Sequence, residues 1–300
     1  MDQLTEFRLI LLGILIEAVP FIVLAAFLSF LFELFVPENF FPRLFGGRVI
    51  TGILIAAAAG FAIPICECCI VPIARKLAKR GVPLPVAVTF MVAVPSLNPI
   101  VMAGTSAAFI TNPQLIYLRA AAGFSLAVAA GLVFFFYDRL RNLSADPFPA
   151  DSTRHCACGA NHSGSEVSSR LRPGLDEAAS DFIRMLGFMV MAALITALIQ
   201  VFVSDSIMNY LAARHTLGAP AMMLFAFVTS TCSDADAFIA AAMNQFGPIP
   251  KLAFLLLGPV LDIKQVLMHF ALLPRRAAIL LLVSFPLLVA VALVFIDFLF

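Results

Sequence analysis

The sequence has few charged residues: only 12% of its 300 residues are Asp, Glu, Lys or Arg, whereas 62% are hydrophobic. Soluble globular domains carry about 25% charged residues, so this composition excludes that class and predicts an integral membrane protein whose first partner is the lipid bilayer. The formal net charge is +1, and the 19 Lys and Arg residues are scattered along the chain. Because no broad basic face can be assembled from them, nucleic acid is excluded as a partner.

The sequence also lacks the short motifs that mark common enzymes. It has no Gly-x-x-x-x-Gly-Lys-Ser/Thr nucleotide loop, no His-Glu-x-x-His and no Gly-x-Ser-x-Gly. Without a phosphate-binding loop the chain cannot hydrolyse ATP by that route, so transport would draw on an ion or proton gradient or on a partner. We therefore expect a protein that is not an enzyme and requires no cofactor.

A secreted disulfide framework and a cleavable signal peptide are absent as well. The six cysteines show no framework spacing, and most lie in or beside segments expected in lipid or cytosol. The first apolar run is too long for a signal-peptide core and has no small-residue cleavage site. We expect this run to remain in the protein.

Long apolar runs dominate what is present. A helix needs about 20 apolar residues to span about 30 Å of hydrocarbon. Eight segments meet or approach that length, which predicts an all-α polytopic membrane protein with about eight transmembrane helices. They are 8–36, 48–65, 86–110, 115–137, 182–203, 252–272, 277–299 and a composite crossing at 219–246.

Lys and Arg residues in the short loops predict the orientation, because cytoplasmic loops are richer in them. One side carries Arg75, Lys76, Lys79, Arg80, Arg139, Arg141, Arg170, Arg172 and Arg184. The other side carries Arg43, Arg48, Arg214, Arg275 and Arg276. We therefore expect both termini and the central loop to face the cytoplasm.

One long polar segment divides the chain. Residues 138–180 are rich in Ser, Asp, Pro and Gly, which is typical of a linker, and they separate a first transmembrane half at 1–137 from a second at 181–300. The linker holds two thiols and two imidazoles within eight residues, a ligand set that soft and borderline metals prefer. A bound metal ion is one interpretation, and an unstructured linker that happens to contain these residues is the other. The four residues are His155, Cys156, Cys158 and His162.

A weak internal repeat relates the two halves. Cys66 and Cys232 lie 166 residues apart, and flanking apolar and Gly residues match at the same offset. Further on, a Pro-x-x-Asn stretch ending at Asn98 matches a Pro-x-x-Asp stretch ending at Asp262, with a two-residue slip. Apolar composition alone does not supply matched Cys, Gly, Pro and Asn or Asp. Repeats of this kind are typical of secondary transporters.

Each half contains two predicted helix breaks, so we expect broken or re-entrant helices. In lipid every backbone N–H and C=O must find a partner, and a break survives only inside the protein or beside a water-filled cavity. The breaks should therefore line the pathway of a small-molecule or ion substrate. They lie at 64–72 and 95–99 in the first half and at 230–236 and 258–264 in the second.

Several ionisable residues fall at membrane depth, where insertion costs about 2.5 to 3.5 kcal/mol each. Asp262 and Lys264 could neutralise each other, and Ser233 or Asp234 could cap a half-helix without excluding contact with substrate. Glu17 lies mid-span in the first helix and either bonds to a neighbouring helix or couples transport to protons. The group consists of Glu17, Glu67, Asp234, Asp236, Asp262 and Lys264.

Cysteines accompany both matched breaks. A single membrane cysteine is most often a small apolar filler. Three thiols around one carboxylate, as in the first break, could instead bind a soft species such as trivalent arsenic, copper or zinc. The candidate substrate-pathway residues are Cys66, Glu67, Cys68, Cys69, Pro95, Asn98, Cys232, Ser233, Asp234, Asp236, Asp262 and Lys264.

The stretches around the breaks form two signatures. The first is CECCIVPIARK at 66–76, continued at 79–83 and 93–101, and the second is CSDADAFIA at 232–240 with GPVLDIK at 258–264. Both resemble the bacterial predicted-permease family that includes the ArsP organoarsenical efflux permeases and the YraQ and YcgR proteins. The resemblance covers nearly the whole chain. The resemblance implies that the functional positions of the family correspond to the following residues of this chain: Cys66, Glu67, Pro95, Asn98, Cys232, Ser233, Asp234, Asp262 and Lys264.

This resemblance implies a permease of the bacterial inner membrane. Some members extrude trivalent organoarsenicals, and copper or zinc export is attributed to a related branch. Glu67 departs from the family pattern, because other members often have Ser there. We therefore predict an efflux permease that moves a small solute, a metalloid or metal species, by gradient-driven alternating access, either alone or as an oligomer.

Two other classes stay open. The first is a membrane-anchored metal or redox sensor, or a subunit of a membrane assembly, in which the Cys/His loop binds metal and the helices anchor it. The second is a thiol oxidoreductase that cycles between Cys66, Cys68 and Cys69.

Overall fold

The computed structural model describes residues 48–64, 67–79, 81–110, 112–141, 190–198 and 218–299, with a few single positions before residue 24 and between 183 and 187. Every element named within these residues is a helix, as expected for an all-α membrane protein. Three described spans are long and apolar enough to cross a membrane: Leu84–Ala108, Pro113–Leu140 and Arg275–Phe298.

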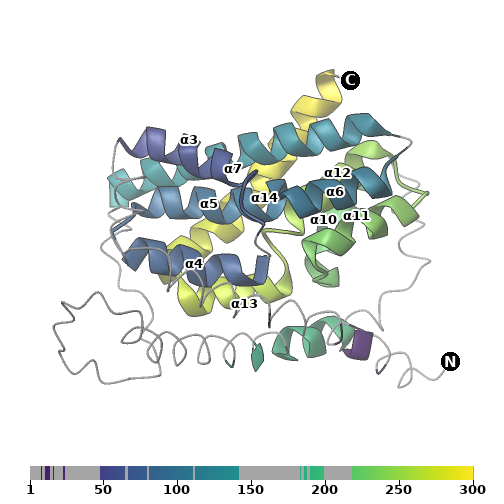
Figure 1. Cartoon of the computed structure of the whole chain (residues 1–300), viewed down its shortest axis with the longest axis horizontal. Coiled ribbons are helices and arrows are strands. Elements are labelled where there is room, and N and C mark those ends of the chain that lie inside the picture. Colours follow the sequence, from purple (N-terminus) through teal and green to yellow (C-terminus); the bar gives the residue numbers. More distant parts are fainter. Residues whose placement is uncertain are drawn as a thin grey trace, which may run out of the picture.

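The first two described helices form a hairpin that enters the bundle and returns. α3 (Val49–Ala59) runs alongside α5 (Leu84–Leu97) and ends near Ala93, where a Cβ added to Gly60 would lie 2.9 Å from this residue. Ala93 is close to the end of α5 but near the middle of the apolar span Leu84–Ala108. α4 (Glu67–Lys79) then runs back and packs against α5 (Figure 1). Residues 48–65 were expected to cross the membrane, and this expectation is wrong because α3 stops in the middle of the bundle.

A broken helix and a long helix complete the first half. α5 continues into α6 (Pro99–Ala108) after a break at Asn98, whose side-chain oxygen accepts a hydrogen bond from the Ile100 N–H at 2.8 Å. α7 (Pro113–Arg141) then runs back across the bundle. The predicted break at 95–99 is therefore real, although it is confined to Asn98 because α5 continues through its internal proline.

The second half repeats this order of elements. α10 (Gly218–Thr229) runs alongside α12 (Pro248–Leu257). α11 (Ser233–Ala242), which lies between these two helices in the sequence, turns back from the end of α10. After residues 258–262 the chain continues as α13 (Ile263–Leu272) and α14 (Arg275–Leu299). The expected composite crossing at 219–246 is also wrong, because α11 turns back instead of extending α10, so the expected count of about eight crossings is not supported.

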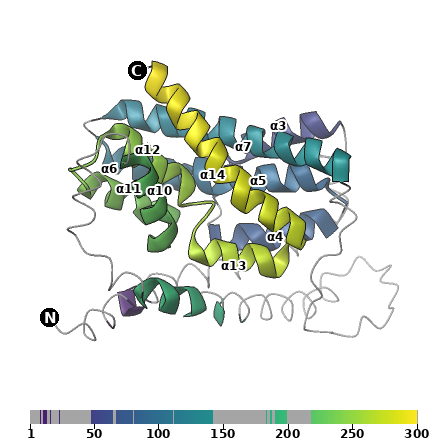
Figure 2. The same cartoon turned by 180° about the vertical axis from the view of Figure 1, so that it is seen from behind.

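The helices of the two halves are packed into each other. α6 of the first half packs against α11 of the second, and α13 of the second half packs against α4 of the first. The two long helices, α7 and α14, are in contact as well. Figures 1 and 2 show α4 and α13 side by side in both views, with α6, α10, α11 and α12 grouped at the other end.

The ends of α7 and α14 define two faces of the bundle. Leu118 near the start of α7 and Asp297 near the end of α14 line the same cavity, so the two helices run in opposite directions. We call the face with this cavity the vestibule face. α7 has 29 residues and is about 44 Å long at 1.5 Å per residue, so Arg141 lies at the opposite end, which we call the linker face.

This geometry corrects the expected orientation. The linker begins directly after Arg141 on the linker face, whereas α14 ends on the vestibule face, so the central loop and the end of α14 do not share one side. The N-terminal segment lies outside the described residues. Several described basic residues lie at helix ends on the linker face, so by the positive-inside rule we predict that this face is cytoplasmic. They are Arg48, Lys76, Arg139, Arg275 and Arg276.

The surface of α14 matches a lipid environment. Its exposed large side chains recur every three or four residues, and neighbours at this spacing share one face of a helix. A purely apolar stripe on a crossing helix is expected only against hydrocarbon. The stripe consists of Ile279, Val283, Leu287, Val291, Val294 and Phe298.

The two-face arrangement predicts the labelling pattern of introduced cysteines. An impermeant thiol reagent applied to intact cells should label Asp297→Cys above the level of the unmodified chain and should leave Arg276→Cys unlabelled until the cells are permeabilised. Labelling of both positions from the same side would contradict a crossing of the membrane by α14.

Close packing inside the first half predicts a strong effect at Gly131. A Cβ at this position would come within 2.0 Å of the Thr89 hydroxyl on α5 and within 3.1 Å of Ile53 on α3. Gly131→Ala should therefore lower the free energy of unfolding by about 1 to 3 kcal/mol through overpacking. Denaturant unfolding in detergent can measure this, with Gly247→Ala as the control because its Cβ would meet nothing within 4 Å. Equal stability of the two variants would contradict the packing.

Candidate functional site

The tips of the two hairpins meet at a carboxylate. Glu67, the first residue of α4, is fully buried, and its Oε2 accepts a hydrogen bond from the Ser233 N–H at 3.1 Å. Ser233 is the first residue of α11, where free N–H groups and the helix dipole favour a negative charge. The two bonded residues are 166 positions apart, which is the offset of the sequence repeat. The first half therefore caps a helix of the second.

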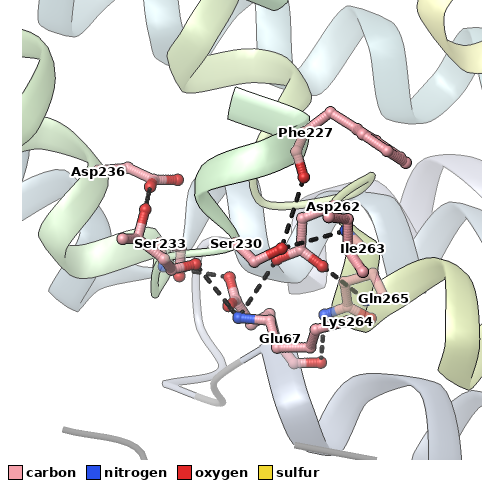
Figure 3. A network of polar contacts seen from close by, with 10 residues as sticks. Glu67, Phe227, Ser230, Ser233, Asp236, Asp262, Ile263, Lys264 and Gln265 are labelled. Atoms are coloured by element: carbon pink, nitrogen blue, oxygen red, sulfur yellow. Dashed lines mark hydrogen bonds and ion pairs between the residues drawn. The ribbon is translucent and has the colours of Figure 1, made fainter. Parts of the chain in front are cut away.

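A buried lysine neutralises this carboxylate. Lys264 Nζ donates to Glu67 Oε1, lies 3.3 Å from Asp262 Oδ2, and donates to the Thr231 carbonyl at 3.2 Å (Figure 3). All three ionised side chains are at most 3% exposed. The expected pairing of Asp262 with Lys264 is present, but the lysine is shared with an acid from the other half. Charges buried to this degree persist only when they are paired and hydrogen-bonded.

Neutral polar groups complete the network. Gln265 Nε2 donates to the Glu67 carbonyl at 2.9 Å, and the Ser230 hydroxyl accepts from the Ile263 N–H at 3.2 Å. Ser230 has a φ of 47°, which is unusual for a residue with a side chain and ends α10 sharply. The network thus ties three interrupted helices, α4, α10 and α13, to one point (Figure 3).

The half-helices are capped by different means. Asp262 Oδ1 accepts from the Gln265 N–H at 2.6 Å and caps α13, as Asn98 caps α6. The N-cap of α11 is Cys232, whose side chain makes no capping bond. The interpretation of Ser233 as a cap is therefore wrong, because Ser233 is already inside the helix and Glu67 supplies the acceptor instead.

A second group of charges lies on the vestibule side of this network. Arg119 of α7 is fully buried and donates to the Thr105 hydroxyl of α6 at 2.5 Å. Its charge and that of Lys264 act on the buried carboxylate of Asp236 in α11, which also accepts a hydrogen bond from the Thr231 hydroxyl. The two groups are joined through Thr231, since its carbonyl accepts from Lys264.

A cavity of about 970 Å³ leads toward this second group from the vestibule face. Its wall includes Phe109, one helical turn beyond Thr105, and Leu115, one turn before Arg119. Lys251 stands at the wall with its Nζ 5.8 Å from the Phe109 ring centroid, a cation–π distance. The floor of the vestibule is thus one turn from the Arg119–Thr105 pair.

The structure brings together most of the residues predicted from sequence. Glu67, Ser233, Asp262 and Lys264 form one network, and Asp236 lies beside it. Cys232 has a partly buried thiol at the start of α11, and Asn98 and Pro95 lie at the break after α5. Cys68, Cys69 and Asp234 have helical backbones, and their side chains lie outside the described residues. Also outside them are Glu17, Cys66, His155, Cys156, Cys158 and His162.

Sequence reasoning missed several buried polar residues. Arg119 interrupts an otherwise apolar run, which was a usable signal because an arginine at membrane depth is costly. Gln265 follows Lys264 directly and could have been added to the same cluster. His269, one turn further along α13 and 3% exposed, gave a similar signal. Thr231 and Ser230 lie within the predicted break at 230–236 but were not named as site residues, since small hydroxyl residues are common in membrane helices.

Comparison with known proteins assigns the class. A family described as predicted permease, of the ArsP type, matches residues 3–298, and the chain therefore belongs to that family. The UPF0718 protein YcgR of Bacillus subtilis (strain 168) is 31% identical over 91% of this chain and 90% of its own length. A Streptococcus mutans protein named "Putative two-component membrane permease complex subunit" is 30% identical over 86% of this chain and 84% of its own. No solved structure matches.

The central ion pair predicts a large stability effect. Lys264→Met would leave Glu67 buried without its counter-charge, which should lower the free energy of unfolding by about 3 to 5 kcal/mol. Glu67→Gln combined with Lys264→Met should recover much of this loss, because no uncompensated carboxylate then remains at that position. Denaturant unfolding in detergent can compare both with Arg275→Met, an exposed control expected within about 0.5 kcal/mol of the unmodified protein. A Lys264→Met protein as stable as this control would contradict the role of the pair.

Proposed function

We propose that this chain is a permease that moves a small solute by alternating access, with the substrate site at the tips of the two hairpins. Membership of the predicted permease family supports transport as the general activity. The observation that carries the proposal is the bond between Glu67 and the Ser233 N–H, where the hairpins of the two halves meet inside the bundle. Secondary transporters usually bind their substrates where the ends of several interrupted helices meet, because charged side chains and peptide dipoles converge there.

The two halves act in this proposal as repeats of opposite orientation. Both contain a hairpin, a broken helix and a long helix in the same order, α3 to α7 and α10 to α14. The broken helices carry a cap at matched places, Asn98 and Asp262. The long helices α7 and α14 run in opposite directions, which supports inversion. In such a pair, movement of one half against the other exposes a central site to each side in turn.

A soft, thiophilic solute fits the side chains near the tips best. The thiol of Cys232 lies at the tip of the second hairpin, and the sequence places three more cysteines around Glu67 in the first. Thiolate ligands favour copper(I), zinc and trivalent arsenic compounds over hard ions. We therefore propose a metalloid or metal species as the substrate and efflux as the direction. A gradient drives the cycle, since the sequence has no nucleotide loop.

A second candidate is a subunit of a membrane assembly. The name of the Streptococcus mutans relative refers to a two-component permease complex, which supports a partner protein for this chain as well. In this alternative the Cys/His motif of the linker binds a metal ion and the helices anchor it. Deleting residues 150–165 should then abolish function, whereas it should only modulate flux through a self-sufficient permease.

Uptake into everted membrane vesicles tests the transport proposal. Methylarsenite, arsenite, copper(I) and zinc should be compared for the unmodified chain, Asp262→Asn and Asp138→Asn. Asp262→Asn keeps a side chain able to cap α13 but removes a central charge, so flux of the transported solute should fall at least about tenfold if the lost interaction is worth about 1.4 kcal/mol in the rate-limiting step. Asp138→Asn, near the end of α7 at the linker face and outside the vestibule wall, should keep full flux. If no solute moves, or both variants behave alike, the proposal fails.

A further inference from the structure

Asp236 differs from the other central acids in its partners. Glu67 has both oxygens engaged, one by Lys264 and the other by the Ser233 N–H. Asp262 Oδ1 accepts from the Gln265 N–H, and its Oδ2 has no hydrogen bond among the described residues but forms an ion pair with Lys264 at 3.3 Å. Asp236 is 2% exposed, and only its Oδ1 is bonded, to the Thr231 hydroxyl; among the described residues its Oδ2 has no hydrogen-bond partner. A buried carboxylate oxygen without a partner is costly, so this position requires an explanation.

The space around Oδ2 admits very little. A Cβ added to Gly258 would lie 2.9 Å from Asp236 Oδ2, so the oxygen rests against the backbone of this glycine after α12. Ca²⁺ takes six to eight oxygens at about 2.3 to 2.6 Å, and Mg²⁺ takes an octahedron of them. Within the described residues no group of three or more His, Cys, Asp or Glu side chains could hold a metal ion. A proton bonded to Oδ2 needs no such shell.

Charged groups of both signs surround the Asp236 carboxyl. Arg119 on α7 and Lys264 on α13 attract a negative charge there, whereas Asp262 repels it. α6 and α12 pack against α11, and the only ionisable side chain they bring is Lys251 at the vestibule wall. The carboxyl is thus held between a buried arginine and a cluster of buried acids. Gain of one proton would remove the charge that Arg119 faces and change the forces between α7 and α11.

The vestibule approaches the Arg119–Thr105 pair, whose arginine acts on the Asp236 carboxyl. The cavity wall comes within one helical turn of both members of the Arg119–Thr105 pair, through Leu115 and Phe109. A carboxyl that is buried but close to a water-filled entrance is suited to exchange protons with one side of the membrane.

We propose that Asp236 binds the proton that drives transport, and that it receives this proton from the vestibule. A hydronium ion in the vestibule gives up one proton, which bonds to Asp236 Oδ2 and leaves water. The carboxylate becomes a neutral carboxylic acid that keeps its hydrogen bond from Thr231. The same O–H bond breaks when a water molecule from the other face accepts the proton and becomes hydronium, which leaves the Asp236 carboxylate. The driving role rests on the proposed transport function, whereas proton binding can be measured without any solute.

Infrared difference titration of the purified full chain in lipid tests the binding step. The carboxylic acid C=O band of a buried acid should appear as the pH falls, should be absent from Asp236→Asn, and should persist in Asp138→Asn, whose position near the end of α7 is outside the vestibule wall. Persistence in Asp236→Asn, or loss in Glu67→Gln instead, would assign the proton to another group and overturn the proposal. Sodium chloride added at fixed pH should not remove the band. Displacement by sodium would mean a metal cation site and would also overturn it.

A steric variant keeps the test decisive if Asp236→Asn does not fold. Gly258→Ala places a methyl group against Oδ2, so the midpoint of the titration should shift, while Gly247→Ala should leave it unchanged. Equal midpoints in both would count against the assignment. The two proposals can fail separately. If the infrared band depends on Asp236 but no solute of the panel is transported, the transport function alone is refuted. If a solute is transported but the band does not depend on Asp236, the proton site alone is refuted.

Discussion

The structure depends on how helix ends inside the bundle find hydrogen-bond partners. A hairpin that turns around within the membrane leaves backbone N–H groups where no bulk water is available. Each starting half-helix solves this with a polar side chain: Asn98 for α6, Asp262 for α13 and Glu67 for α11. The first two are local caps, whereas Glu67 comes from the other half. Because its carboxylate is buried, it in turn requires the positive charge of Lys264.

The exchange of contacts between the halves follows from the same requirement. α4 and α11 begin at the centre of the bundle, so each needs a neighbour that also begins or breaks there. The broken helices provide this, and α4 packs against α13 while α11 packs against α6. Charges from both halves therefore share one site. Neither hairpin alone can supply all the hydrogen-bond partners and counter-charges that the groups at its tip require. A relative movement of the halves must rearrange Glu67, Lys264 and Ser233 together.

Sequence could predict the features that are set by local chemistry. Pro, Gly, Asn and Asp disfavour or cap helices wherever they occur, so the four breaks and most of the central residues were identifiable. The return of α4 and α11 was not, because an apolar count cannot distinguish a crossing from a hairpin of equal hydrophobicity. That error also reversed the side assigned to the end of α14. The bond from Ser233 to Glu67 was beyond prediction, since it depends on how two halves separated by 166 residues pack.

Thr231 gives the two charged groups a direct mechanical link. Its hydroxyl donates to Asp236, and its carbonyl accepts from Lys264 at 3.2 Å, so one residue of the α10–α11 tip contacts both sites. A change in the charge of Asp236 alters the strength of the hydroxyl bond, because hydrogen bonds to an ionised carboxylate are stronger than those to a neutral acid. The tip residue would then shift relative to Lys264, whose remaining partners are Glu67 and Asp262. Protonation near the vestibule thereby acts on the ion pair that holds the two hairpins together, and no long-range pathway is required for the coupling.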